Sequence, residues 1–184
     1  MKKPLLAVVT GRPAAGKSTL AYRLKDALRV PIVCRDEIKE GHIRTLGGPT
    51  NMDSELPARV NDAFFATIDL LLDRGVSLVA VAAFQNRVWA PRLEPMLDRA
   101  DLRIVVCDVS GPVAVERQSE RDRQDPDRVA YHPYTAGYDG LTFEYDPPRL
   151  PVPTLKVNTA AGYEPDLDSI LVFLTQDSNH SPGT

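Results

Sequence analysis

The sequence has few cysteines and no long apolar run, and both absences restrict the class of protein. Its two cysteines, Cys34 and Cys107, stand inside apolar stretches, which is typical of buried thiols and not of a disulfide framework or a metal site. No stretch approaches the ~20 apolar residues that a membrane-spanning helix needs. The apolar start at 5–9 is too short for a signal peptide and is followed by Gly-Arg-Pro. We therefore expect a cytoplasmic protein without a membrane partner.

The chain also lacks an excess of basic residues. Its 22 Lys and Arg stand against 25 Asp and Glu, which gives a net charge of −3. Tight binding of nucleic acid requires many cations to meet the phosphates, so this balance argues against a nucleic-acid partner. A chain of 184 residues, 43% of them hydrophobic and 26% charged, is typical of one globular domain. We expect that domain to cover 1–176, with a flexible tail at 177–184, and the choice between monomer and homodimer stays open.

The strongest pattern lies near the N-terminus, where a short apolar strand is followed by a glycine-containing turn and a helix. The spacing Gly11-x-x-x-x-Gly16-Lys17-Ser18 is that of a phosphate-binding loop, the Walker A motif. Glycines let successive backbone N–H groups point inward at an anion, and the N-terminus of the following helix adds its positive dipole. The predicted nucleotide-binding residues of this loop are Gly11, Arg12, Pro13, Ala14, Ala15, Gly16, Lys17, Ser18 and Thr19.

Two residues of this loop have specific tasks in phosphoryl transfer. Lys17 would reach the β- and γ-phosphates and act as a catalytic cation, and the hydroxyl of Ser18 would ligate Mg²⁺. The sequence contains no guanine-recognition motif of the Asn/Thr-Lys-x-Asp type. ATP with Mg²⁺ is therefore the expected cofactor, and Ser18 is the expected metal ligand.

Apolar strands alternate with amphipathic helices along the rest of the chain, which predicts an α/β fold with a parallel sheet and helices on both faces. Ligands of such folds bind at the carboxyl ends of the strands. The stretch 125–153 is rich in proline and tyrosine and too long for an ordinary connection, so it is a lid, a substrate loop or partly disordered. We expect strands at 5–11, 31–34, 77–84, 102–109 and 155–157, and helices at 17–29, 37–45, 55–74, 87–100, 112–124 and 167–174.

Asp36 directly follows the second predicted strand and opens a helix. Beside a phosphate loop this position faces the γ-phosphate, where a carboxylate can hold an acceptor hydroxyl and receive its proton. The alternative is a plain helix N-cap, a position that Asp favours. Lys39 and His42 follow one and two turns later on the same face and could touch substrate, although a solvated helix face is the simpler interpretation of both.

Arginines gather in the helix after the fourth strand. Arg117 and Arg121 are four residues apart and share one face of this helix. Charge builds on the transferred phosphoryl group during the reaction, and an arginine of the same chain can stabilise it, a role that we predict for Arg121. The alternative is a surface helix laced with salt bridges, because acidic residues alternate with the arginines.

Other residues give weaker signals. Trp89 fits the packing of the helix after the third strand better than stacking on a base. Gln85 and Asn86 could bond substrate or cap that helix. Four residues of the proline- and tyrosine-rich stretch could line a substrate pocket, although a surface position is the better interpretation of the histidine: Tyr131, His132, Tyr134 and Tyr138.

At these residues the chain resembles the small P-loop kinases of the adenylate-kinase-like fold. It is most similar to actinobacterial AAA family ATPase proteins related to zeta toxins, chloramphenicol phosphotransferase and the kinase domain of polynucleotide kinase. The resemblance extends to about Leu174. The segments that carry it are GRPAAGKST (11–19), CRDEIK (34–39), AAFQNRVWAPRLEPML (82–97) and VVCDVSGPVAVERQSERDR (105–123).

The resemblance implies a three-layer sandwich with strand order 2-3-1-4-5 and a small lid and substrate loop at about 117–153. It implies that Asp36 is the general base. One lid arginine would pack on the adenine and another would reach phosphate, and Arg117 and Arg121 match those places. The loop Asn158-Thr159-Ala160 would lie against the adenine, so Thr159 is a further predicted nucleotide-binding residue.

One departure from the family's pattern concerns the metal. Many relatives carry an acidic residue near the end of the third strand, whereas residues 79–83 of this chain are Val-Ala-Val-Ala-Ala. Mg²⁺ would then depend on Ser18, water and the phosphates, with Asp36 or Asp108 as a further ligand.

Three functions remain open at this stage. The first is an ATP-dependent kinase that phosphorylates a hydroxyl group of a small molecule. The second keeps this chemistry but takes the 5′-hydroxyl of a nucleic acid, which the acidic balance of the chain disfavours. The third is a nucleotide-binding regulatory module without turnover, which the missing third-strand acid favours and the presence of Asp36 disfavours.

Overall fold

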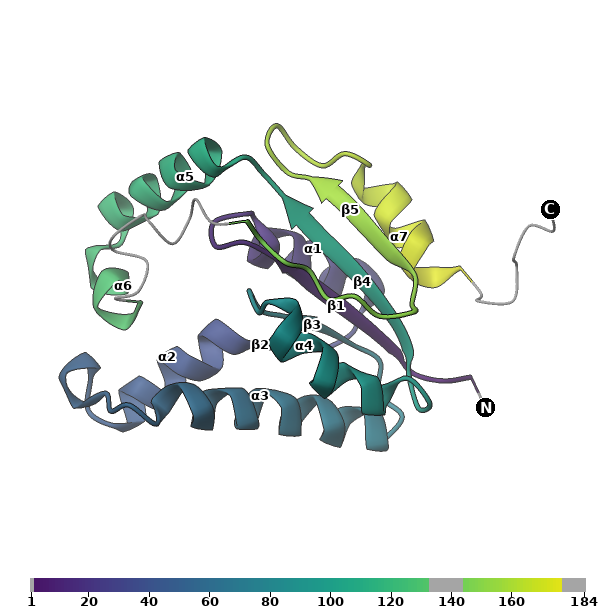
Figure 1. Cartoon of the computed structure of the whole chain (residues 1–184), viewed down its shortest axis with the longest axis horizontal. Helices are drawn as coiled ribbons and strands as arrows, with labels where there is room; N and C mark the ends of the chain where they lie inside the picture. Colours follow the sequence, from purple (N-terminus) through teal and green to yellow (C-terminus); the bar gives the residue numbers. More distant parts are fainter. Residues whose placement is uncertain (1, 133–143, 177–184) are drawn as a thin grey trace.

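The apolar strands form one five-stranded sheet in the order β2-β3-β1-β4-β5, and every neighbouring pair runs parallel. The computed structural model describes residues 2–132 and 144–176 (Figure 1). The strands are β1 (Leu5–Gly11), β2 (Ile32–Cys34), β3 (Leu78–Val81), β4 (Asp101–Asp108) and β5 (Thr154–Asn158). The predicted fold class and strand order are thereby confirmed.

Seven helices and two 3-10 turns occur in the described parts of the chain. The predicted tail at 177–184, together with Tyr134 and Tyr138, lies outside the described residues. Within those residues no helix is both long enough and apolar enough to cross a bilayer. The helices are α1 (Lys17–Leu28), α2 (Arg35–Thr45), α3 (Leu56–Asp73), α4 (Asn86–Leu93), α5 (Gly111–Gln124), α6 (Pro126–Tyr131) and α7 (Leu167–Thr175), and the turns are η1 (Pro49–Asn51) and η2 (Glu94–Met96).

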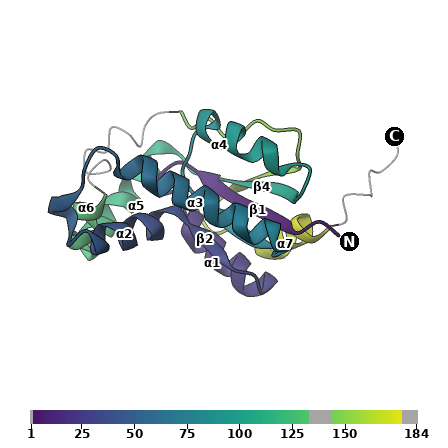
Figure 2. The ribbon, with the colours of Figure 1, turned by 90° about the horizontal axis from the view of Figure 1, so that it is seen from below.

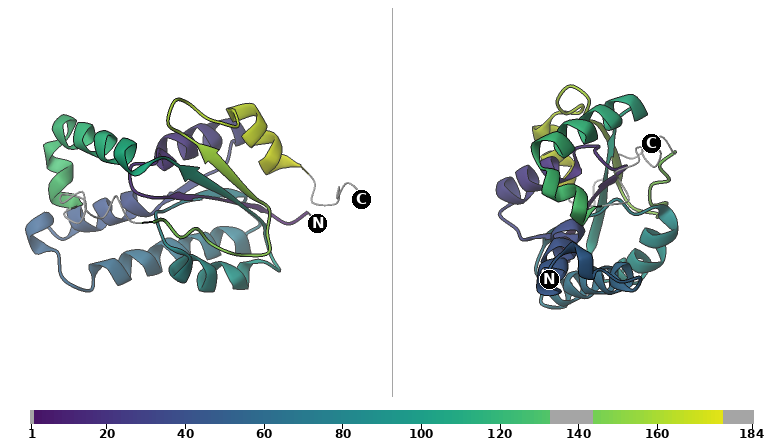
Figure 3. Two further views of the ribbon diagram at one scale, coloured as in Figure 1. Left: turned by 45° about the horizontal axis from the view of Figure 1, so that its top comes forward. Right: turned by 90° about the vertical axis from the view of Figure 1, so that its left-hand side faces the viewer.

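Side chains alternate between the two faces of the sheet and build a core on each. Along β1, Leu6 and Val8 face one cluster, which includes residues of α3 and α4, and Ala7 and Val9 face another, which includes residues of α1 and α7. The sheet therefore lies between two helical layers (Figure 3). Helices α2, α5 and α6 gather at the end to which the strands point (Figures 1 and 2).

Two predicted boundaries were wrong, and one helix was not predicted. Strand β3 ends at Val81 and not at 84, because the carbonyl of Ala82 accepts a hydrogen bond from Thr10 Oγ1 (3.0 Å) instead of continuing the ladder. The helix expected at 87–100 ends at Leu93, since Pro95 has no N–H and its segment tightens into η2. Helix α6 was missed inside the stretch expected as a loop, although a proline at the first helical position is a known start signal.

The segment 144–152 returns past the residues that join β3 to α4 and is fixed there by amide side chains. Gln85 Oε1 accepts a hydrogen bond from the backbone N–H of Asp146 (2.7 Å), and Asn86 Oδ1 accepts one from that of Arg149 (2.8 Å). Gln85 stands at the N-cap position of α4 without making a side-chain cap. Both side chains therefore hold the returning segment, and the expected side-chain cap by Gln85 was wrong, whereas a contact with substrate stays a prediction.

A buried network of hydroxyl groups anchors the same segment beneath the start of the phosphate loop. Tyr145 donates to the carbonyl of Phe84 (2.7 Å), and its hydroxyl also contacts Thr10 Oγ1. Trp89 is fully buried and donates through Nε1 to the same Thr10 oxygen (3.0 Å). Burial raises the pKa of Tyr145 to about 12, so this hydroxyl stays protonated at neutral pH. The packing role expected for Trp89 agrees with this arrangement.

The fold predicts that Gly11 tolerates no side chain. Its φ is +140°, and a Cβ at this position would lie 2.2 Å from the carbonyl oxygen of Cys107 on β4. We expect Gly11→Ala to lower the free energy of unfolding, measured by urea denaturation, by about 2–4 kcal/mol.

A matched control is Gly41→Ala, because Gly41 lies inside α2 and a Cβ there would meet nothing within 4 Å. This change should raise stability by about 0.5–1 kcal/mol, the usual gain for a helix interior. Equal stabilities of the two variants would contradict the close approach of β1 to β4.

Candidate active site

The phosphate loop connects β1 to α1 and leaves the first turn of the helix without a side-chain cap. Gly16 occupies the N-cap position in the left-handed conformation, with φ +78°, and, having no side chain, does not cap the N–H groups of the first turn. Ala14 also has a left-handed φ of 59°. Uncapped N–H groups at a helix N-terminus, together with the helix dipole, form a site for an anion.

Lys17 lies beneath this loop and is buried, with 9% of its surface exposed. Its ammonium group donates a hydrogen bond to the carbonyl of Arg12 (2.8 Å). Burial lowers the pKa of Lys17 to about 8, and the nearby carboxylate of Asp36 opposes this shift. The ammonium group is therefore charged at neutral pH and is held at the loop before any phosphate arrives.

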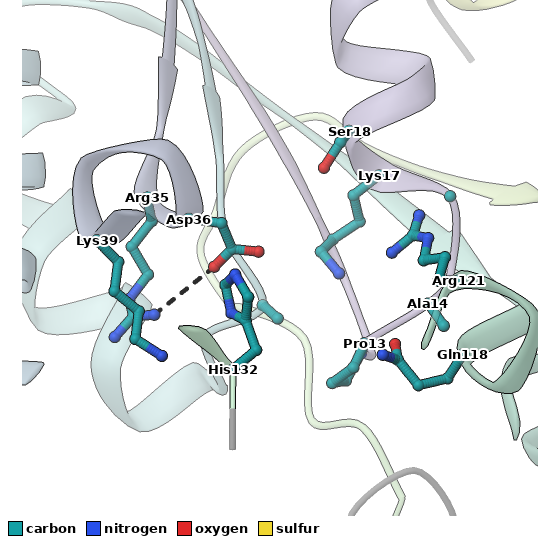
Figure 4. Close-up of a pocket in the computed structure, with 12 residues that line it drawn as sticks. Pro13, Ala14, Lys17, Ser18, Arg35, Asp36, Lys39, Gln118, Arg121 and His132 are labelled. Atoms are coloured by element: carbon teal, nitrogen blue, oxygen red, sulfur yellow. Dashed lines mark ion pairs between the residues drawn. The ribbon is translucent and has the colours of Figure 1, made fainter. Parts of the chain in front are cut away.

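A cavity of about 190 Å³ opens beside Lys17 and collects most of the predicted catalytic residues (Figure 4). Lys17 and Ser18 line one side of it, and Asp36 lies on the opposite side. Gln118 and Arg121 of α5, together with His132, which follows α6, complete the wall of the cavity. The lining residues are Pro13, Ala14, Gly16, Lys17, Ser18, Arg35, Asp36, Lys39, Ala83, Gln118, Arg121 and His132.

Asp36 is the second residue of α2, and its carboxylate borders the cavity. Cys34 takes the N-cap position of this helix, so the alternative interpretation of Asp36 as the N-cap was wrong. The side chain of Asp36 is 45% exposed, and Nη1 of Arg35 lies 3.7 Å from its Oδ1. At this distance the ion pair is longer than a good hydrogen bond, which leaves the carboxylate able to accept a proton from a bound group.

The expectation of a solvated face for Lys39 was wrong. Lys39 is only 7% exposed and lines the cavity one turn after Asp36, because α2 turns this face toward α5 and α6 across the site. His42 is half-buried and does not line the cavity. Arg35 and Gln118 also line the cavity, and the sequence analysis missed both, although each is adjacent to a residue that it named.

His132 was expected at the surface, and this was wrong as well. Its side chain is 11% exposed, and its Nε2 lies 2.9 Å from Oε1 of Glu40. The unpredicted helix α6 brings it over α2. Tyr131, the last residue of α6, packs against a small apolar cluster that contains Ile43 and Leu56 and does not line the cavity.

A second cavity, of about 550 Å³, lies on the other side of the phosphate loop. It is lined by residues of α1 and α5 and by the loop after β5, among them Thr19, Arg117 and Thr159. Arg121, Ala14 and Gly16 border both cavities. One extended ligand can therefore occupy the larger cavity and reach along the loop to Lys17.

Contacts between α5 and the loop after β5 form one wall of this second cavity. Thr159 is buried, and its hydroxyl donates to the carbonyl of Ala15 (2.9 Å). Arg117 donates to the carbonyls of Thr159 and Ala160, the latter at 3.1 Å. Arg123, in contrast, pairs with Glu120 on the exposed face of α5 (2.7 Å). Glu120 lines the second cavity beside Arg117 and Arg121, so the charged pairs of α5 extend to the cavity that these two predicted arginines border.

The structure narrows the candidate ligands for a metal. Asp108 pairs with Lys156 (2.9 Å) and borders a third cavity, whose lining includes neither Lys17 nor Ser18. Within 2–132 and 144–176, no group of three or more His, Cys, Asp or Glu side chains could hold a metal ion. The residues near the loop that fit Mg²⁺ are Ser18 and Asp36, with oxygen ligands also supplied by the phosphates.

Comparisons with known proteins agree with this geometry. A family model described as an AAA domain matches residues 6–133, which is more than half of the chain. No curated protein matches the sequence.

Several solved structures share the fold. A provisionally assigned kinase from Chloroflexus aurantiacus j-10-fl has 26% identity and a TM-score of 0.75, with 93% of each chain covered. The Mycobacterium tuberculosis APS kinase CysC, solved with AMPPNP and APS, has 19% identity and a TM-score of 0.65, with 96% of this chain and 100% of that chain covered. A gluconokinase from Sinorhizobium meliloti 1021 has 17% identity and a TM-score of 0.55, with 95% and 93% covered.

The pKa of Lys17 generates a prediction for nucleotide binding. Because Lys17 loses its proton with a pKa of about 8 in the free protein, and bound phosphates would raise that pKa, affinity should be complete well below pH 8 and decline as the pH rises through 8 and above it. The dissociation constant of ADP, whose phosphates are ionised throughout, should increase about eightfold between pH 7.5 and pH 9.

Two variants identify the responsible group by calorimetry. Lys17→Ala should abolish tight ADP binding and flatten the pH profile of what remains. Lys25→Ala removes a half-buried lysine of α1 that pairs with Asp26 and lines neither cavity, and it should keep both the affinity and the profile of the unchanged chain. Cys107 does not contribute to the pH profile of ADP binding in this range, because burial raises its pKa to about 12. Retention of tight binding by Lys17→Ala would refute the phosphate-loop assignment.

Proposed function

Because this chain belongs to the AAA domain family and has the fold of P-loop kinases, we propose that it is an ATP-dependent phosphotransferase acting on a small molecule. The γ-phosphoryl group of ATP would pass to a hydroxyl group of the acceptor. The observation that carries this proposal is the position of Asp36, whose carboxylate lies across one small cavity from Lys17 and Ser18. A protein that only bound nucleotide would need no carboxylate there.

The two cavities suggest how the nucleotide would lie. The base and ribose would occupy the larger cavity, against Arg117 and Thr159. The phosphates would follow the backbone N–H groups of the loop, so that the γ-phosphate enters the smaller cavity beside Lys17. Ser18 would hold Mg²⁺ together with phosphate oxygens, and the ion would neutralise part of the phosphate charge.

Transfer then requires one proton acceptor and one further cation. The acceptor oxygen forms a bond to the γ-phosphorus while the bond to the β-phosphate oxygen breaks, and ADP leaves. The carboxylate of Asp36 takes the proton of the hydroxyl. Arg121 borders both cavities and would stabilise the charge that spreads over the transferred oxygens.

The polynucleotide kinase alternative has less support. A cavity of about 190 Å³ beside the phosphate loop suits a small acceptor, and the balance of 25 acidic against 22 basic residues disfavours tight binding of a nucleic acid. The regulatory alternative rests on the residues directly after the third strand, where Ala83 borders the cavity and supplies no carboxylate. The carboxylate of Asp36 at the cavity favours the kinase over this regulatory alternative.

Replacement of Asp36 tests the proposed chemistry. Asp36→Asn keeps the size of the side chain and removes its basicity, so acceptor-dependent ADP release should fall about 10²–10⁴-fold. The affinity for ADP measured without Mg²⁺ should change less than about twofold, because Asp36 belongs to α2 and not to the phosphate loop. The assay would use Mg²⁺, ATP and a panel of nucleosides, sugars, sugar acids, aminoglycosides and a 5′-hydroxyl oligonucleotide.

The matched control is Glu37→Gln, the next residue of the same helix, whose side chain is exposed and does not line the cavity. It should retain full activity. A normal rate in Asp36→Asn would remove Asp36 from the chemistry, and stimulation by the oligonucleotide alone would replace the small-molecule acceptor with a nucleic acid.

A further inference from the structure

Strand β1 extends further along β4 than along β3, so its last two residues have a neighbouring strand on one side only. The ladder with β4 continues to Gly11, at the start of the phosphate loop, whereas the ladder with β3 stops at Val9. The N–H of Ala82 donates to the carbonyl of Val9 (3.4 Å), and β3 has ended by then. Groups other than a strand must therefore hold Thr10 and Gly11 on the β3 side.

The hydroxyl group of Tyr145 lies on this open side. It contacts Thr10 Oγ1 and donates to the carbonyl of Phe84 (2.7 Å). Burial raises its pKa, and the hydroxyl of Thr10 and the backbone N–H of Gly11 oppose that shift, so both groups face the phenol oxygen. Thr10 is fully buried, and its hydroxyl donates to the carbonyl of Ala82 (3.0 Å). These side-chain contacts take the place of the ladder that a longer β3 would provide.

The groups that hold Thr10 are themselves fixed. The backbone next to Tyr145 is held by the side chains of Gln85 and Asn86 through hydrogen bonds of 2.7 and 2.8 Å, and its ring packs against the apolar core. Trp89 is fully buried and donates to the same Thr10 oxygen (3.0 Å). Two immobilised side chains, from segments far apart in the sequence, therefore converge on the residue that precedes the phosphate loop.

We propose that the hydroxyl group of Tyr145 positions the phosphate loop for the nucleotide, because through Thr10 it fixes the point at which the loop leaves the sheet. This inference rests on the proposed kinase function and adds a positioning residue to its phosphate site. Tyr145 lines neither of the two cavities assigned to the nucleotide, so it acts through the loop and not on the phosphates. A loop that already presents its N–H groups to one point binds an anion more tightly than a loop that must be ordered on binding.

The test removes each hydroxyl group while nearly keeping the shape of the side chain. Tyr145→Phe and Thr10→Val, in the full chain, should each weaken the binding of ADP and of inorganic pyrophosphate by about three- to tenfold, measured by calorimetry without Mg²⁺. Pyrophosphate has no base or ribose, so an equal loss for both ligands locates the effect at the phosphate loop. Thr10→Ser keeps the hydroxyl group and should bind both ligands within about twofold of the unchanged chain.

The matched control removes a hydroxyl group from the opposite end of the same strand. Ser77 Oγ accepts a hydrogen bond from the N–H of Leu5, the first residue of β1 (2.9 Å). Ser77→Ala should lower the stability and keep the affinities for ADP and pyrophosphate within about twofold. The emission maximum of Trp89, the one tryptophan of the chain, should be unchanged in Ser77→Ala and in Tyr145→Phe, which shows that the core of both variants is intact.

A double variant tests whether the two hydroxyl groups act as one unit. Thr10→Val combined with Tyr145→Phe should bind ADP no more weakly than the weaker of the two single variants, because both substitutions break the same chain of contacts. Losses that multiply would show two independent effects and would contradict the proposed action of Tyr145 through Thr10.

The possible failures are distinguishable. If ADP does not bind the unchanged chain, the kinase proposal fails and this inference fails with it. If ADP binds and both hydroxyl deletions bind it as tightly as Ser77→Ala does, the inference is wrong and the kinase proposal stands. The same holds if Thr10→Ser loses as much affinity as Thr10→Val, since packing and not the hydroxyl group would then be responsible, or if the affinity for ADP falls and that for pyrophosphate does not.

Discussion

The close approach of β1 to β4 is the constraint on which the site depends. Gly11 lies so near the backbone of Cys107 that no side chain fits, and the chain turns out of the sheet at that point. The turn places the loop over Lys17 and presents the uncapped first turn of α1 to the carboxyl ends of the strands. Asp36 lies near the same loop because β2 ends immediately before α2, and the carboxyl ends of all the parallel strands lie on one side of the sheet.

A second feature of the site is the burial of a charged group, the ammonium of Lys17. Burial lowers the pKa of Lys17, and the carboxylate of Asp36 opposes this shift. The ammonium group also donates a hydrogen bond to the carbonyl of Arg12. An anion that enters would replace these weak partners with stronger ones, so its binding draws on a charge that is already in place. On the α2 side of the cavity, Arg35 is likewise fixed, by Asn61 and the Phe84 ring.

The sequence predicted the fold because its signals are local. The apolar strands, the helical periodicity and the phosphate-loop spacing each need only neighbouring residues, and residues 11–19, Asp36 and Arg121 were named from such signals. Lys39 and His132 were misjudged because their burial depends on how α2 and α6 meet across the cavity, which no local pattern encodes. The contacts of Gln85 and Asn86 with the segment 144–149 join residues about 60 positions apart and were equally inaccessible.

Both cysteines belong to the strands around Lys17, and their burial has a chemical consequence. Cys34 ends β2, Cys107 lies on β4 beside the phosphate loop, and burial raises the pKa of each thiol. Only the thiolate reacts readily with oxidants and alkylating reagents, so both thiols should react slowly while the strands around them remain folded. The rate of their alkylation therefore reports how often the strands beneath the site open, and the chain carries this reporter without any engineered label.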